Sequence, residues 1–131
     1  MEYSLKYIKK ILKKLSEDPV TNKTPTIVFA RDPKCNLNEF KLDDLSCYGM
    51  FTSINPNNAI SVFEGSHALQ GNLDPKSLLE EDSVIKQSVS RRLSDFKDYP
   101  GYIFNLGHGI TPDINPDKVK VLVEAIRDSG S

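Results

Sequence analysis

One histidine stands between two glycines near the end of the chain, in the sequence GYIFNLGHGI at residues 101–110. An imidazole changes its charge near neutral pH, so it can bind an anion or transfer a proton. Gly107 and Gly109 permit backbone angles that are closed to other residues, and successive N–H groups in such a turn can point at one anion. His108 is therefore a candidate ligand-binding residue, and the alternative is a surface histidine without a ligand.

Other residue types that support catalysis form no recognisable set. The second histidine, His67 in the sequence SHAL, is interpreted as a surface residue or a satisfied hydrogen-bonding group. No G-x-S-x-G, H-E-x-x-H, P-loop or G-x-G-x-x-G sequence occurs. Cys35 and Cys47 form no C-x-x-C pair and are too few for a disulfide framework. We therefore expect reduced thiols in a cytoplasmic protein and no metal site.

The composition is that of one globular domain. The chain has 131 residues, 38% of them hydrophobic, and a formal net charge of −1. This near-zero charge gives no general attraction to nucleic acid. No stretch approaches the roughly 18 apolar residues of a membrane span. We expect a single domain over residues 1–131 that has neither nucleic acid nor membrane as a partner.

The first segment, at about residues 3–17, predicts an amphipathic helix. Its lysines lie away from one apolar face, which consists of Leu5, Ile8, Leu12 and Leu15. A basic amphipathic helix can lie on a membrane surface or bind a calmodulin-type partner. The alternative is an outer helix that packs on a sheet and leaves its lysines in water. We favour the alternative because the remainder of the chain is acidic.

Four short apolar segments predict strands, each followed by a helix. The strands are expected at residues 25–30, within 46–54, at 66–70 and at 102–106, and an Asp32–Pro33 turn ends the first. Three helices are expected to begin where an N-capping side chain precedes proline, at Asn55, Asp74 and Asn115. This alternation predicts a parallel sheet with crossover helices. It is half of an eight-unit barrel or a small open α/β sheet.

The loops that follow the predicted strands are the places for a ligand, because parallel α/β proteins bind ligands at the carboxyl ends of their strands. Arg31 lies in the first of these loops, in the sequence RDPK. His108 lies in the last, in GHGITPDINP. Arg31, Gly107 and Gly109 are possible further contacts beside His108.

Three segments resemble signature sequences of the uroporphyrinogen decarboxylase family. They are PTIVFARD at 25–32, ALQGNLDPKSLL at 68–79 and YIFNLGHGITPDINPDKVKVLVEAI at 102–126. The family forms a (β/α)8 TIM-type barrel that converts uroporphyrinogen III to coproporphyrinogen III, in haem biosynthesis, without metal or cofactor. The resemblance implies an α/β fold that corresponds to the C-terminal half of that barrel, strands 5–8.

The resemblance also implies one site residue. The histidine of the family's L-G-H-G corresponds to His108, which is implied to contact the tetrapyrrole substrate, uroporphyrinogen. The family's aspartate, arginine and tyrosine, which hold the pyrrole N–H groups and handle carboxylates and protons, belong to the half with no counterpart here. The resemblance therefore assigns no catalytic residue to this chain, which is expected to be catalytically incomplete alone.

The chain departs from the family pattern at the expected mouth of the barrel. The family's G-x-D-W is Gly-Met-Phe-Thr at residues 49–52, the lysine of F-A-K is Arg31, and Pro33 stands where a small residue is usual. Such changes would accumulate in a protein that is no longer required to be catalytically active. The H-x-C ligands of related zinc-dependent methyltransferases are absent after both His67 and His108.

Three functions stay open on this basis. The chain is a lyase fragment, a non-catalytic module that binds a tetrapyrrole or a protein partner, or a decayed relic. A half barrel leaves two unpaired sheet edges, which invite pairing with other strands. We therefore expect a homo-oligomer or a complementary N-terminal half as a partner.

Overall fold

The fold is taken from a computed structural model, which describes residues 2–31 and 36–130 and the side chains from residue 4 onward. The turn expected at Asp32–Pro33 and the thiol of Cys35 lie outside the described residues. No helix in the described part of the chain is long and apolar enough to cross a membrane.

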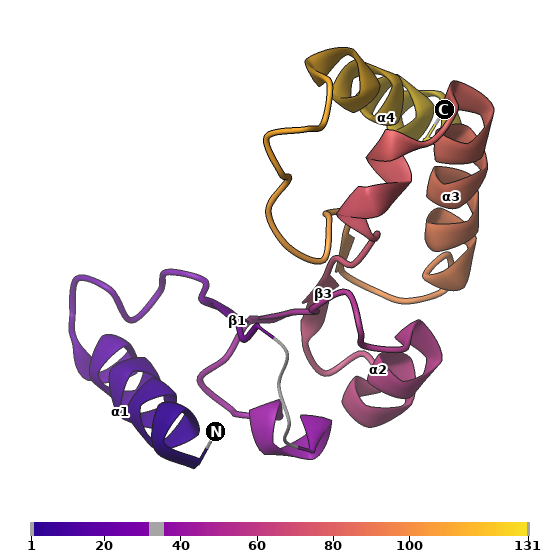
Figure 1. The fold of residues 1–131 in the computed structure, drawn as a ribbon. Helices are drawn as coiled ribbons and strands as arrows, with labels where there is room; N and C mark the ends of the chain where they lie inside the picture. Colours follow the sequence, from indigo (N-terminus) through magenta and orange to yellow (C-terminus); the bar gives the residue numbers. More distant parts are fainter. Residues whose placement is uncertain (1, 32–35, 131) are drawn as a thin grey trace.

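Four parallel strands form one sheet in chain order (Figure 1). They are β1 (Ile27–Phe29), β2 (Cys47–Gly49), β3 (Ala68–Gln70) and β4 (Tyr102–Ile103). Phe29 pairs in register with Gly49, Gly49 with Gln70, and Gln70 with Ile103. The α/β class and the parallel sheet are therefore confirmed, with strands shorter than the predicted segments.

In the described residues four α-helices accompany the sheet: α1 (Glu2–Glu17), α2 (Pro56–Phe63), α3 (Asp82–Asp95) and α4 (Pro116–Ser129). The predicted caps of α2 and α4 are confirmed. The side-chain oxygen of Asn55 accepts the Asn57 N–H at 2.9 Å, and that of Asn115 accepts the Asp117 N–H at 2.9 Å. Proline follows each cap, where its missing N–H costs nothing.

Two segments that were predicted to begin α-helices form 3-10 helices instead. Asp74 caps only a 3-10 segment, η2 (Pro75–Leu79), and α3 begins later, after an extended Glu80. In the described part of the segment after β1, the helical element is another 3-10 turn, η1 (Leu37–Phe40). Leu37 and Phe40 are its two buried residues, and their spacing of three matches the three residues per turn of a 3-10 helix.

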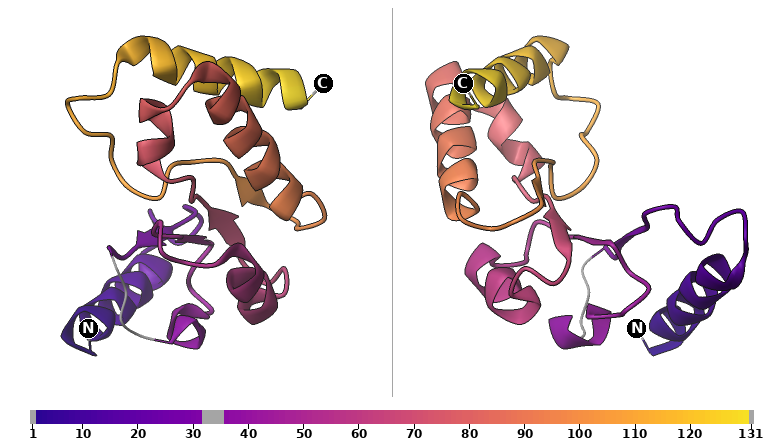
Figure 2. Two further views of the ribbon diagram at one scale, coloured as in Figure 1. Left: turned by 45° about the vertical axis from the view of Figure 1, so that its right-hand side comes forward. Right: turned by 180° about the vertical axis from the view of Figure 1, so that it is seen from behind.

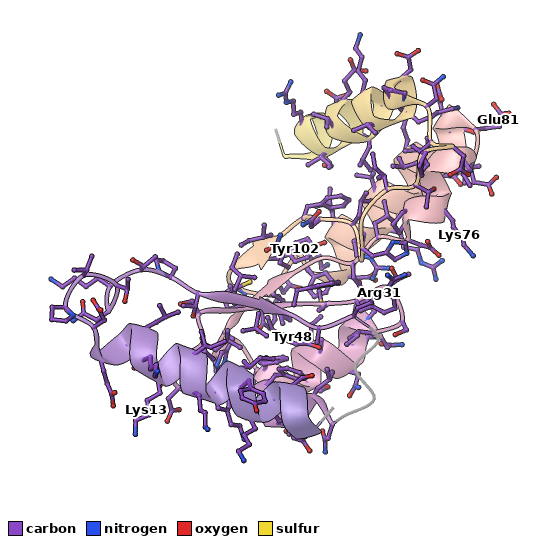
Figure 3. The ribbon with its side chains drawn as sticks, turned by 60° about the vertical axis from the view of Figure 1, so that its left-hand side comes forward. Lys13, Arg31, Tyr48, Lys76, Glu81 and Tyr102 are labelled. Carbon is purple, nitrogen blue, oxygen red and sulfur yellow. The ribbon has the colours of Figure 1, made fainter. Side chains whose placement is uncertain are left out.

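The helices cover one face of the sheet. Tyr48 of β2 is fully buried there, with its ring centroid 4.9 Å from that of Phe40 and 5.3 Å from that of Phe63, and Figure 3 labels it. Leu5 and Leu12 of α1 are buried in the same cluster. The interpretation of the first helix as an outer helix packed beside the sheet is therefore confirmed.

A second core joins η2, α3 and α4. Figure 2 shows α3 and α4 side by side, at the opposite end of the molecule from α1 and η1. Apolar residues from η2, α3, α4 and the flanking loops form this core: Leu73, Leu78, Ile85, Val89, Ile114 and Leu122. The first cluster thus holds α1, η1 and α2, and the second holds η2, α3 and α4.

The opposite face of the sheet is bare. Ile27, Phe29 and Ile103 are 56%, 49% and 44% exposed, which is unusual for large apolar side chains in a sheet. The strand register puts all three on one face, because side chains alternate along a strand and aligned residues share a face. None of the described helices covers this face.

Candidate functional site

A pocket of about 310 Å³ lies on the bare face, toward the carboxyl ends of the strands. It is lined by residues of all the strand ends or of the loops that follow them, among them Phe29, Met50, Gln70, Asn105, His108 and Gly109. His108 and Gly109, singled out from the sequence, therefore lie at this pocket. The sheet brings together residues that are up to 82 positions apart in the chain, from Ile27 to Gly109, because its strands are parallel and adjacent.

The geometry of His108 leaves one ring nitrogen for a ligand. Its Nδ1 lies 2.8 Å from the carbonyl oxygen of Gly109. A carbonyl only accepts a hydrogen bond, so Nδ1 carries a proton and donates it. Nε2 then accepts a hydrogen bond in the neutral ring and donates one in the imidazolium. The half-buried side chain can thus bind a donor or a carboxylate at Nε2.

The His108 ring is also held by an aromatic contact. Its centroid lies 5.6 Å from that of Phe51, with 30° between the planes, and Phe51 in turn lies 6.3 Å from Phe29. These three rings come from β1 and from the loops after β2 and β4. Sequence reasoning gave no role to Phe29 and treated the residue at position 51 only as a lost acid.

Gly107 has a different role from the one predicted. Neither Gly107 nor Gly109 has a positive φ, so neither position needs glycine for its backbone angles. A Cβ at residue 107 would instead lie 2.6 Å from the backbone nitrogen of Thr52, so glycine allows the two loops to touch. The Gly107 N–H donates to the Leu73 carbonyl at 2.8 Å and is not turned toward an anion. The Gly107 N–H is therefore not available to an anion, and a contact between Gly107 or Gly109 and a ligand stays a prediction.

Asn72 is a structural residue of the site that sequence reasoning missed. Its side chain is 1% exposed, and Nδ2 donates to the carbonyl oxygens of Phe51 at 2.8 Å and of Ile54 at 2.7 Å. These bonds hold the loop that carries Phe51. The only signal in the sequence was its place in the GNLDP loop after the third strand.

Arg31 lies beyond the carboxyl end of β1, where Figure 3 labels it. The side chain is exposed and is not among the residues that line the pocket. A contact between Arg31 and a substrate therefore stays a prediction.

His67 has a structural role, as interpreted from the sequence. Its ring is buried, with Nε2 2.8 Å from the Leu42 carbonyl oxygen and Nδ1 2.8 Å from the Ser66 hydroxyl. Both ring nitrogens are therefore occupied within the protein. Among the described residues, no three histidine, cysteine, aspartate or glutamate side chains are grouped so that they could hold a metal ion.

The pocket that contains His108 lies at the carboxyl ends of four parallel strands. This is where parallel α/β proteins bind their ligands. The family model described as uroporphyrinogen decarboxylase matches residues 1–129. The chain therefore belongs to the uroporphyrinogen decarboxylase family, and the resemblance seen in the sequence is confirmed.

Curated relatives carry the same family name. The uroporphyrinogen decarboxylase of Alcanivorax borkumensis is 38% identical over 125 residues, which are 95% of this chain and 35% of the relative. That of Hahella chejuensis is 34% identical over 128 residues, which are 98% of this chain and 36% of the relative. The chain thus spans about a third of the length of the curated relatives that it matches.

Proposed function

We propose that this chain supplies the His108 side of a uroporphyrinogen-binding site in a uroporphyrinogen decarboxylase. The observation that carries the proposal is the position of His108 in the 310 Å³ pocket, at the carboxyl ends of parallel strands. Family membership supplies the identity of the ligand. In this function Nε2 of His108 binds a substrate carboxylate, and the apolar wall beside it contacts a pyrrole ring.

The chemistry of decarboxylation requires more than this pocket offers. Loss of carbon dioxide leaves an electron pair that must be accepted, and a proton must then be delivered to the substrate carbon. His108 is the one ionisable side chain among the described residues that line the pocket. Charge stabilisation needs several preorganised groups aimed at the developing charge, and proton transfer needs a positioned acid or base, whereas this pocket offers one ionisable group. We therefore propose that the chain binds substrate but needs further residues for catalysis.

We also propose that the fold is the C-terminal half of a (β/α)8 barrel, formed by residues 1–131 as one domain. The bare face with Ile27, Phe29 and Ile103 supports this proposal, because such a face lies inside a closed barrel. β1 and β4 are the edge strands of the described sheet, each paired on one side. Four further parallel strands between these edges would complete the barrel and cover the apolar face.

The partner that we propose is the complementary part of a uroporphyrinogen decarboxylase, and a second copy of this chain is the alternative. A groove of about 450 Å³ beside α4, lined by Ile110, Val119 and Val123 among others, supports a partner on that flank as well. The free thiol of buried Cys47 and the composition support a cytoplasmic location for the assembly.

The test is reconstitution from two chains. The purified chain is mixed with a separate polypeptide that contains the part of the Alcanivorax borkumensis relative outside the matched 125 residues. Anaerobic conversion of uroporphyrinogen is followed by chromatography of the oxidised porphyrins. We expect no turnover by either chain alone and turnover by the mixture.

Sedimentation of the same samples identifies the partner. A 1:1 complex of the two different chains is expected. A stable dimer of this chain that ignores the added polypeptide would support the homo-oligomer instead. Turnover by this chain alone would contradict catalytic incompleteness, and a folded 1:1 complex that neither binds nor converts the substrate would contradict the proposed function.

A further inference from the structure

Phe51 lies behind two rings that face the pocket. Phe29 and His108 are lining residues of the pocket, whereas Phe51 is not. The Phe51 ring contacts both of them, at centroid distances of 6.3 Å and 5.6 Å. Its side chain is half-buried.

The backbone of Phe51 is held by a buried amide. Asn72, which is 1% exposed, donates from Nδ2 to the Phe51 carbonyl at 2.8 Å and to the Ile54 carbonyl at 2.7 Å. One side chain thereby holds both ends of the turn after β2. The backbone that carries the Phe51 ring is therefore held in place at both ends of this turn.

The imidazole of His108 is then constrained in two ways. The hydrogen bond from Nδ1 to the Gly109 carbonyl holds one edge of the ring, and the stack on Phe51 holds its plane. An imidazole rotates about two side-chain torsions, so an edge contact together with a face contact defines its orientation. Nε2 is left as the ring nitrogen available to a ligand.

We propose that Phe51 is the positioning residue for His108, which it orients for binding a carboxylate on a flat pyrrole ring. Phe29, supported by the same phenyl ring, provides the aromatic surface for that pyrrole. The identity of the ligand rests on the proposed function, whereas the positioning rests on the ring contacts alone. The aromatic residue that replaces the family's acid at position 51 thus acts in the site instead of marking its loss.

The first experiment needs no ligand. Histidine is labelled with carbon-13 and the ring-proton resonances of His108 are compared in the chain and its variants. Phe51→Leu is expected to remove the ring-current displacement of these resonances, whereas Phe51→Tyr retains it. Phe104→Leu is the matched control, because this half-buried phenylalanine contacts Tyr102 instead. Unchanged His108 resonances in Phe51→Leu would overturn the positioning role.

The second experiment measures uroporphyrinogen binding to the reconstituted two-chain protein under anaerobic conditions, in a double-mutant cycle. Aromatic contacts contribute about 1 kcal/mol, so Phe51→Leu is expected to weaken binding by about fivefold. If Phe51 acts through His108, then Phe51→Leu has little further effect in the His108→Ala background. Fully additive losses of affinity in the double variant would contradict the inference that Phe51 acts through His108.

The two experiments separate the two proposals. If the unmodified protein does not bind uroporphyrinogen, the proposed function fails and the ligand assigned to this site fails with it. The resonance comparison still decides whether the Phe51 and His108 rings are in contact, because it is made without any ligand.

Discussion

Gly107 and Thr52 approach so closely that a Cβ at residue 107 would lie 2.6 Å from the Thr52 backbone nitrogen. The contact joins the loop that carries His108 to the loop that carries Phe51. We predict that Gly107→Ala destabilises the protein by about 1–3 kcal/mol, the usual cost of overpacking. Urea unfolding of the purified chain measures this change.

Gly109→Ala is the matched control for that substitution. A Cβ at residue 109 meets nothing within 4 Å, and Gly109 does not have a positive φ. The expected change in unfolding free energy is within about 0.5 kcal/mol. Equal effects of the two substitutions would show that the loops are not in contact.

Asn72→Asp tests the buried amide. The two side chains have nearly the same shape, but an ionised aspartate cannot donate to the Phe51 and Ile54 carbonyls. We predict a loss of at least about 2 kcal/mol, because two buried acceptors lose their partner and face a carboxylate. Asn105→Asp is the control, since the Asn105 side chain accepts from the Leu106 N–H and aspartate can do the same. A loss no larger in Asn72→Asp than in the control would contradict the assignment.

Tyr102 is expected to make stability depend on alkaline pH. Burial raises the pKa of its phenol, and the hydroxyl donates to the Gly71 carbonyl at 2.5 Å. The folded chain therefore holds this proton more tightly than the unfolded chain. The unfolding free energy should fall as the pH rises above the unfolded pKa of about 10, and should show no such effect below it.

Tyr102→Phe is compared with the unmodified chain by urea unfolding across that pH range. The variant is expected to lose about 1 kcal/mol near neutral pH, because the Gly71 carbonyl loses its donor. Its stability should then fall less steeply above pH 10. Parallel curves for the two proteins would assign the alkaline dependence to other groups.

His108→Ala is predicted to affect substrate binding more than turnover. The expected role of His108 is contact with the substrate rather than proton delivery, so its loss should raise KM more than it lowers kcat in the reconstituted enzyme. Steady-state kinetics on uroporphyrinogen measure both constants. His67→Ala is the comparison, because His67 is occupied by Leu42 and Ser66 and should act through stability alone. An unchanged KM in His108→Ala would remove His108 from the site.

Sequence signals correctly predicted those helix starts that depend only on residues adjacent in the chain. Asn55 and Asn115 cap helices because the cap, the proline and the first turn are neighbours in the chain. The same signal at Asp74 produces only a 3-10 segment, because the chain is extended at Glu80 and begins α3 afresh at Asp82. Neither Glu80 nor Glu81 offers a sequence signal for that interruption, and Glu81 caps α3 without a side-chain hydrogen bond.

The site could be predicted only in outline. The place of His108 after the last strand follows from strand order, because the carboxyl ends of parallel strands meet. Its contact with Phe51 joins residues that are 57 positions apart, and no local pattern encodes it. The requirement for glycine at position 107 was expected from torsion angles but comes from Thr52. Such contacts depend on the packing of two loops.

The order of the strands has a consequence for how the chain can fold during its synthesis on the ribosome. Each strand from β2 onward pairs with the strand synthesised before it, and the sheet contains no strand inserted between earlier ones. Pairing between strands that are successive in the chain closes shorter loops than any other strand order would, which keeps the entropic cost of loop closure low. The sheet can therefore form one strand at a time as the polypeptide leaves the ribosome, because the strand with which each new strand pairs has already been synthesised.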